Sequence, residues 1–96
     1  MEPTDRLAAL RAAVLDGPGV TASSLRQAAA SGAAPRPWTE YVRAVRDASY
    51  LVSEEDIAAL KADGLGEEEI FEVTVAAAVG AALARLDAGL RVAGPS

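Results

Sequence analysis

The sequence predicts an all-α protein, a small bundle of about five helices that ends in a long, nearly all-round apolar helix. Apolar residues recur at helical spacing, and no segment alternates as a strand does. Cap residues and glycines divide the chain into segments of helical length. We therefore predict a single domain over 1–96, with an N-terminal helical pair (1–34), a linker (35–37) and a C-terminal helical segment (38–93).

The first two helices are predicted from their end signals. Thr4 is the expected N-cap of the first helix, and Leu7, Leu10 and Val14 form its apolar stripe. The sequence DGPG at 16–19 stops this helix. Thr21 is the expected N-cap of the second helix, which ends at Gly32.

The third and fourth helices follow the proline-containing linker. The third helix is expected over 38–49, with a core stripe that consists of Trp38, Tyr41, Val42, Val45 and Ala48. Ser53 and Asp56 stand at the positions of a capping box and open the fourth helix. Gly64 supplies the left-handed residue that ends it.

The last helix is expected over 67–90, and its faces differ in side-chain size. On a helical wheel, a polar edge holds Glu72, Ala76, Gly80, Asp87 and Arg91. A bulky apolar face holds Val75, Val79, Leu83, Leu86 and Leu90, and a third face holds small residues, among them Thr74, Ala77, Ala78, Ala81 and Ala82. Because so short a chain has few helices to cover both apolar faces, we expect this helix to contribute to a subunit interface through Phe71, Val75, Ala78, Ala82 and Leu86.

Arg85 falls on the face of small residues, where a guanidinium group needs a carboxylate or carbonyl partner. Two interpretations stay open. In the first, Arg85 is structural: its side chain extends toward solvent or pairs with Glu40, Asp47 or Asp56. In the second, Arg85 contacts an anion or a second subunit.

Composition excludes several classes of function. The net charge of −5 disfavours binding to nucleic acid or to an anionic membrane surface, and the apolar run at 73–84 is too short for a membrane span. The chain has no Cys and no His, so it lacks thiolate nucleophiles, the commonest general base and the commonest metal ligand. We expect no cofactor and no metal, and the sequence MEPTDRL lacks the pattern of a signal peptide, which favours a cytoplasmic location.

Three motifs have a functional and a structural interpretation. The helix–turn–helix spacing around Gly64 would suggest DNA binding, but the second helix begins with Glu67, Glu68 and Glu69, which repel phosphates. The pair Ser23-Ser24 would suggest a phosphopantetheine carrier, but the acidic residue expected before the serine is absent. The acidic blocks at 54–56 and 67–69 are interpreted as helix N-terminal charge, since neither has the spacing of a calcium loop.

From residue 38 to residue 90 the sequence resembles the C-terminal part of the AhpD-like, carboxymuconolactone-decarboxylase-related helical family. The residues that carry the resemblance lie at 52–60 (VSEEDIAAL), 62–65 (ADGL), 68–72 (EEIFE) and 84–90 (ARLDAGL). The resemblance implies that family's helical fold and a tendency to oligomerise. Active members carry a Cys-x-x-Cys pair followed by a His, and this chain has neither, so the resemblance transfers no catalytic residue.

The sequence therefore predicts a non-catalytic helical protein that self-associates and scaffolds or regulates a partner protein. The alternative is a small-molecule binder or weak enzyme. Its pocket would lie between the last helix and the helix of Trp38 and Tyr41, with Arg85 or a tyrosine orienting the ligand.

Overall fold

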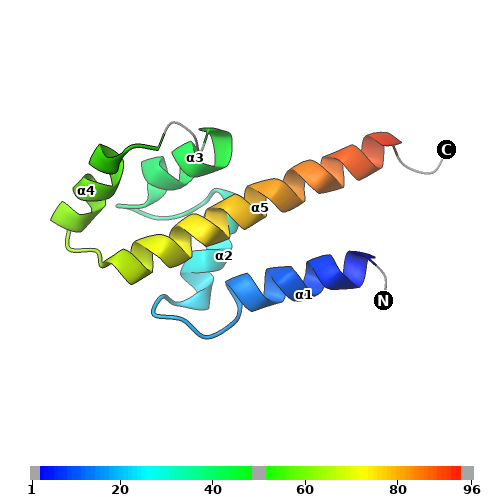
Figure 1. Cartoon of the computed structure of the whole chain (residues 1–96), viewed down its shortest axis with the longest axis horizontal. Helices are drawn as coiled ribbons and strands as arrows, with labels where there is room; N and C mark the ends of the chain where they lie inside the picture. The colour runs from blue at the N-terminus through cyan, green and yellow to red at the C-terminus, as the bar shows by residue number, and fades with distance from the viewer. Residues whose placement is uncertain (1–2, 49–51, 94–96) are drawn as a thin grey trace.

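The part of the chain that the structure describes folds into five α-helices, which confirms the predicted fold class. A computed structural model describes residues 3–48 and 52–93 (Figure 1). The helices are α1 (Pro3–Leu15), α2 (Ser23–Ser31), α3 (Thr39–Ala48), α4 (Glu54–Ala62) and α5 (Glu67–Ala93). Figure 1 shows α5 running along the molecule, with α1 beside its second half, α3 and α4 on the other side, and α2 crossing it.

The core lies where α2 and α3 pack against the first half of α5. Val73, Ala76 and Ala77 of α5 are fully buried, together with Ala29 of α2 and Val42 of α3. Trp38, Tyr41 and Val45 are also buried, as predicted for the third helix, although this helix begins at Thr39. The side chains of Leu7, Ala48, Leu90 and Arg91, which the predicted stripes and faces include, lie outside the described part of the chain.

Helix α5 approaches α2 most closely at Gly80. A Cβ atom built on Gly80 would lie only 2.2 Å from the backbone oxygen of Ala30. The two backbones can meet at this distance because Gly80 has no side chain. Ala76 and Gly80 are therefore buried, and the polar edge predicted for them is wrong over the first half of α5. Neither Ala76 nor Gly80 has a polar side-chain group that would need solvent. The side of α5 that holds them can therefore pack against α2.

Three of the predicted helix ends are confirmed. Ser53 and Asp56 form a reciprocal capping box, with the side chain of each accepting a hydrogen bond from the backbone N–H of the other. Gly32 and Gly64 adopt left-handed conformations, with φ of 83° and 91°, after α2 and α4.

The predicted N-terminal ends of α1 and α2 are wrong. Helix α1 begins at Pro3, so Thr4 lies inside it. The N-cap of α2 is Ala22, and Thr21 instead makes hydrogen bonds with Glu72, 51 residues away in the sequence. The Thr21 hydroxyl thus binds the Glu72 carboxylate instead of a backbone N–H group at the start of α2.

The predicted apolar stripe of α1 is corrected as well. Leu10 is 48% exposed, whereas Leu15, which the stripe omits, is fully buried. Among the described side chains of α1, Leu15 is buried, Val14 is half-buried and the others are exposed. Helix α1 thus enters the core through its last turn, and helical spacing alone does not reveal this.

Helix α5 is the longest helix, as predicted, and extends to Ala93. A circumference that is apolar nearly all round is not supported, because Arg85 and Asp87 are exposed on its second half. No helix in the described part of the chain combines the length and the hydropathy of a membrane span.

The contact between Gly80 and Ala30 makes Gly80→Ala a destabilising change. Alanine normally favours a helix over glycine by about 1 kcal/mol. Here the new methyl group must displace the α2 backbone, and we expect a net loss of about 1–3 kcal/mol of unfolding free energy in urea denaturation. Gly89→Ala on the same helix is the control, since its Cβ would meet no atom within 4 Å, and it should not destabilise. A Gly80→Ala protein as stable as the wild type would contradict the close packing.

Candidate functional site

The predicted interface residues lie on one side of α5, facing away from α2. We call Phe71, Val75, Ala78, Ala82 and Leu86 the α5 stripe. Phe71 is 68% exposed and Leu86 is 42% exposed. Ala78 and Ala82 are exposed and Val75 is half-buried. At about 100° per residue, these five positions lie within a narrow arc opposite Gly80. Phe71, Ala78 and Ala82 are therefore exposed on this side of α5, whereas Val75 and Leu86 also line hollows that α5 shares with α1.

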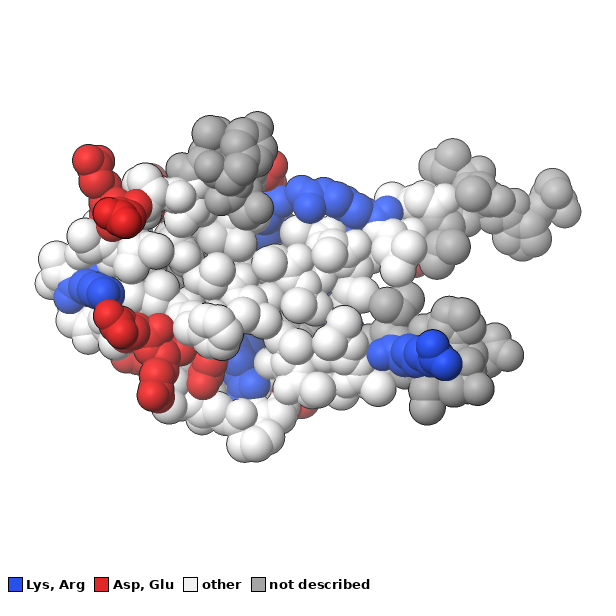
Figure 2. All heavy atoms as spheres, viewed as in Figure 1, with Lys and Arg blue, Asp and Glu red and all other residues white. Residues whose placement is uncertain are grey.

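Charges of opposite sign stand at the two ends of the α5 stripe. Glu67, Glu68 and Glu69 form the first turn of α5, and Arg85 lies near the other end. Figure 2 shows acidic side chains gathered over α4 and the start of α5, whereas basic side chains predominate toward the other end. Lys61 pairs with Glu67 at 2.7 Å, and this bond and charge lower the pKa of Glu67 below its ordinary value. The molecule is thus electrically polarised along the stripe.

Glu72 lies beside Phe71 and holds the loop between α1 and α2 against α5. Its carboxylate accepts hydrogen bonds from the hydroxyl of Thr21 at 2.5 Å, the N–H of Val20 at 2.7 Å and the N–H of Thr21 at 2.9 Å. The Thr21 hydroxyl and the two N–H groups favour the ionised carboxylate and lower the pKa of Glu72 below its ordinary value of 4.5. One end of the stripe is thereby fixed to the N-terminal half of the chain.

Arg26 of α2 binds the backbone near both ends of the loop between α1 and α2. This role is not evident from the sequence. This residue is only 5% exposed. Its Nη1 donates to the carbonyl oxygen of Val14 at 2.9 Å, and its Nη2 donates to that of Thr21 at 3.4 Å. Both acceptors are backbone atoms that only the folded chain brings to Arg26, so no local sequence signal identifies this buried charge.

The predicted polar residues Trp38, Tyr41 and Arg85 lie in different surroundings. Trp38 is 4% exposed and belongs to the core. Tyr41 shares a hydrogen bond of 2.7 Å with Thr74 and lines a hollow of about 330 Å³ with Ile57 and Phe71. Arg85 donates from Nη2 to the carbonyl oxygen of Arg46 at 2.6 Å.

The partner of Arg85 is thus a backbone carbonyl, one of the two kinds of partner expected, and it comes from the last turn of α3. The last carbonyl groups of a helix have no partner within it and attract cations. Of the two interpretations of Arg85, this contact supports the structural one.

The acidic blocks take part in helix capping. Asp56 completes the capping box of α4, and Glu69 accepts a hydrogen bond from the N–H of Gly66 at 3.0 Å at the start of α5. Within residues 3–48 and 52–93, no group of three or more acidic side chains is placed to hold a metal ion. The blocks contribute to helix ends and to the charge at the start of the stripe.

No protein-family model matches the chain, and neither a curated protein nor a solved structure matches it. The relation to the AhpD-like family thus stays a prediction that rests on the sequence pattern.

The hydrogen bonds of Glu72 make its contribution to stability dependent on pH. Because folding lowers the pKa of Glu72, the stabilisation is fully present above the ordinary pKa of 4.5 that this carboxyl has in the unfolded chain. It is lost as the pH falls through the lower pKa of the folded protein. We expect Glu72→Gln to lower the melting temperature at pH 7, and the difference from wild type to shrink below about pH 4.

Glu68→Gln is the matched control for Glu72→Gln. Glu68 is exposed on the same helix, one turn before Glu72, and its removal leaves the contacts of the α1–α2 loop intact. Thermal unfolding of both variants at pH 7 and pH 3 measures the difference. Equal melting temperatures for wild type and Glu72→Gln at pH 7 would rule out the stabilising role of this carboxylate.

Proposed function

We propose that this protein acts by association rather than by catalysis: two copies pair through the α5 stripe, and the pair scaffolds or regulates a partner protein. The observation that supports the proposal is the exposure of two large apolar side chains, Phe71 and Leu86, at the two ends of the α5 stripe. Large apolar side chains exposed in one contiguous patch are typical of interaction surfaces. The lack of Cys and His agrees with a role that needs no nucleophile or general base.

The shape of the stripe suits a second copy of itself. Four of its positions are symmetric about the bond between Ala78 and Val79, since Phe71 and Leu86 are equally far from it, as are Val75 and Ala82. This symmetry pairs the fifth position, Ala78, with Val79 of the other copy. In an antiparallel pair of α5 helices, Phe71 of one copy therefore meets Leu86 of the other, and Val75 meets Ala82. Ala78 lies at the centre, where a small side chain lets the two backbones approach closely.

The charges along α5 favour the same antiparallel arrangement. Antiparallel pairing places the acidic first turn of one copy opposite residues 88–90 of the other, about one turn beyond Arg85. Parallel pairing would place Glu67, Glu68 and Glu69 of both copies together, and like charges in contact are destabilising. The stripe is small compared with the roughly 800 Å² per partner of a standard interface, so we expect a weak, reversible dimer.

Relationship to the AhpD-like family is part of this proposal. The resemblance at 52–60 and 84–90 supports it, because the family's helical fold is associated with oligomers. The redox activity of the family is not proposed for this chain, which lacks the thiols that perform it. A cytoplasmic location and an unidentified protein partner likewise stay predictions.

A charge at the centre of the stripe should prevent pairing. We expect Ala78→Glu to stay monomeric over a concentration range in which the wild type dimerises, as measured by light scattering behind a sizing column. The free energy needed to bury the two new carboxylates against each other would exceed the binding free energy that the apolar contacts of the stripe supply. Ala88→Glu is the control, because Ala88 is exposed on the same helix and lies outside the stripe. A wild-type protein that is monomeric at millimolar concentration would overturn the proposal.

The orientation of the pair can be tested with single cysteines, because the chain has none of its own. Position 68 of one copy faces position 89 of the other in the antiparallel pair. We expect a mixture of Glu68→Cys and Gly89→Cys proteins to form a disulfide-linked dimer between the two variants under mild oxidation. Each variant alone should stay unlinked. Efficient linkage of Glu68→Cys with itself would instead show parallel pairing.

A further inference from the structure

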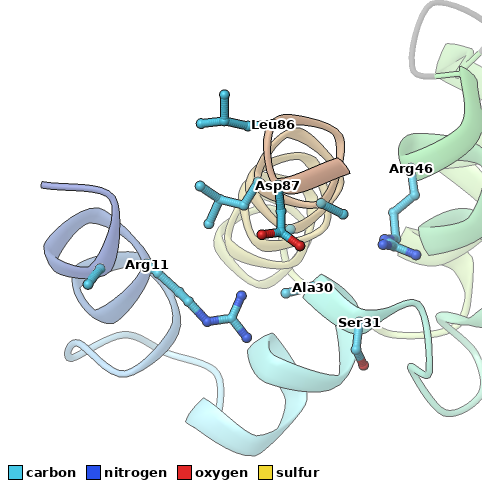
Figure 3. Close-up of a pocket in the computed structure, with 10 residues that line it drawn as sticks. Arg11, Ala30, Ser31, Arg46, Leu86 and Asp87 are labelled. Carbon is cyan, nitrogen blue, oxygen red and sulfur yellow. The ribbon is translucent and has the colours of Figure 1, made fainter. Parts of the chain in front are cut away.

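A hollow of about 470 Å³ lies where α1, α2 and α3 meet the second half of α5 (Figure 3). Leu83 and Leu86 of α5 and Ala30 of α2 supply apolar surface. Charged groups enter from two sides, Arg11 from α1 and Arg46 from α3. Figure 3 shows these two arginines on opposite sides of α5, with Asp87 between them. Such a mixture of apolar surface and a few converging polar groups is typical of ligand sites.

Arg46 has an unsatisfied hydrogen-bond donor at this hollow. Its Nε is buried, and no hydrogen-bond acceptor for it exists among the described residues. The same guanidinium group lies against Gly32, where an added Cβ would come within 2.5 Å of Nη1. The Nε atom of Arg26 is unpartnered in the same way, and neither Nε is accessible to solvent. The hollow therefore offers a ligand the positive charge of the Arg46 guanidinium group rather than its Nε donor.

The charge balance of the lining residues favours an anion. Arg11 and Arg46 bring two positive charges, and Asp87 brings the one carboxylate of the lining, which leaves one positive charge in excess. Asp87 makes an interaction of its own. In a protein whose net charge is −5, a hollow with an excess of positive charge is a local exception. Two guanidinium groups from separate helices match the two oxygens of a carboxylate.

We propose that this hollow binds an amphipathic carboxylate, whose head lies between Arg11 and Arg46 and whose short apolar chain lies along Leu83 and Leu86. The site goes beyond self-association and does not depend on it. It also differs from the pocket expected beside Trp38 and Tyr41, because its cationic residues come from α1 and α3 and its lining includes neither aromatic residue. The site could not be predicted from the sequence, since its lining residues come from four helices that only the fold brings together.

Octanoate is a suitable probe, because it joins one carboxylate to a short apolar chain. We expect octanoate to shift the backbone amide signals of Ser31, Gly80 and Leu83 in a saturable manner in two-dimensional NMR titrations. Acetate lacks the apolar chain and octanamide lacks the charge, so each should bind at least roughly tenfold more weakly than octanoate. Equal binding of octanamide, or shifts confined to Phe71 and Thr74 beside the other hollow, would overturn the proposal.

Variants of the charged residues complete the test. Arg46→Gln and Arg11→Gln should each weaken octanoate binding roughly tenfold, and Asp87→Asn should strengthen it. Arg43→Gln, an exposed change on α3 outside this hollow, should leave the affinity unchanged. Arg11 is exposed, so its variant reports on binding even if Arg46→Gln does not fold. Unchanged affinity in Arg11→Gln would overturn the proposal.

Discussion

The close approach of α5 to α2 at Gly80 is the constraint on which the remaining structure depends. Gly80 meets the backbone of Ala30, and Val73, Ala76 and Ala77 are buried around the same crossing. A helix is rigid about its own axis, so fixing this face inward also fixes the opposite face outward. Phe71 is 68% exposed and Leu86 is 42% exposed for this geometric reason. The packing of α5 against α2 thus determines both which residues of α5 enter the core and which residues form the apolar stripe.

Arginine side chains connect the helices around this core by binding carbonyl groups at helix ends. Arg26 donates to Val14 in the last turn of α1, and Arg85 donates to Arg46 in the last turn of α3. Carbonyls in a last turn lack a partner within their own helix and carry partial negative charge, so a guanidinium from another helix satisfies them. The acidic residues act in the complementary way at the N-terminal ends of α4 and α5. Arg26 makes its contact within the protein and Arg85 makes its contact at the surface, so both basic groups serve to join helices.

Features set by neighbouring residues could be predicted from the sequence, and features set by distant ones could not. The Ser53–Asp56 capping box, the end of α2 at Gly32 and the left-handed Gly64 depend on residues a few positions apart, and all were predicted correctly. The cap expected from Thr21 failed because Glu72, 51 residues later, takes its hydroxyl and its N–H. The helical wheel gave the angles between the faces of α5 correctly, but it could not tell which face α2 would cover. Arg11 and Arg46 were missed for the same reason, since only the packing of four helices brings them to one hollow.

Leu86 connects the proposed interface to the proposed ligand site, because it belongs to the α5 stripe and also lines the hollow. A second copy seated on the stripe would contact the same side chain that the apolar chain of a carboxylate contacts. Two binding events that share a side chain are coupled, and thermodynamic linkage requires each to alter the other by the same factor. In the antiparallel pair Leu86 packs against Phe71 of the other copy, so the hollow loses one wall and pairing opposes binding of the ligand.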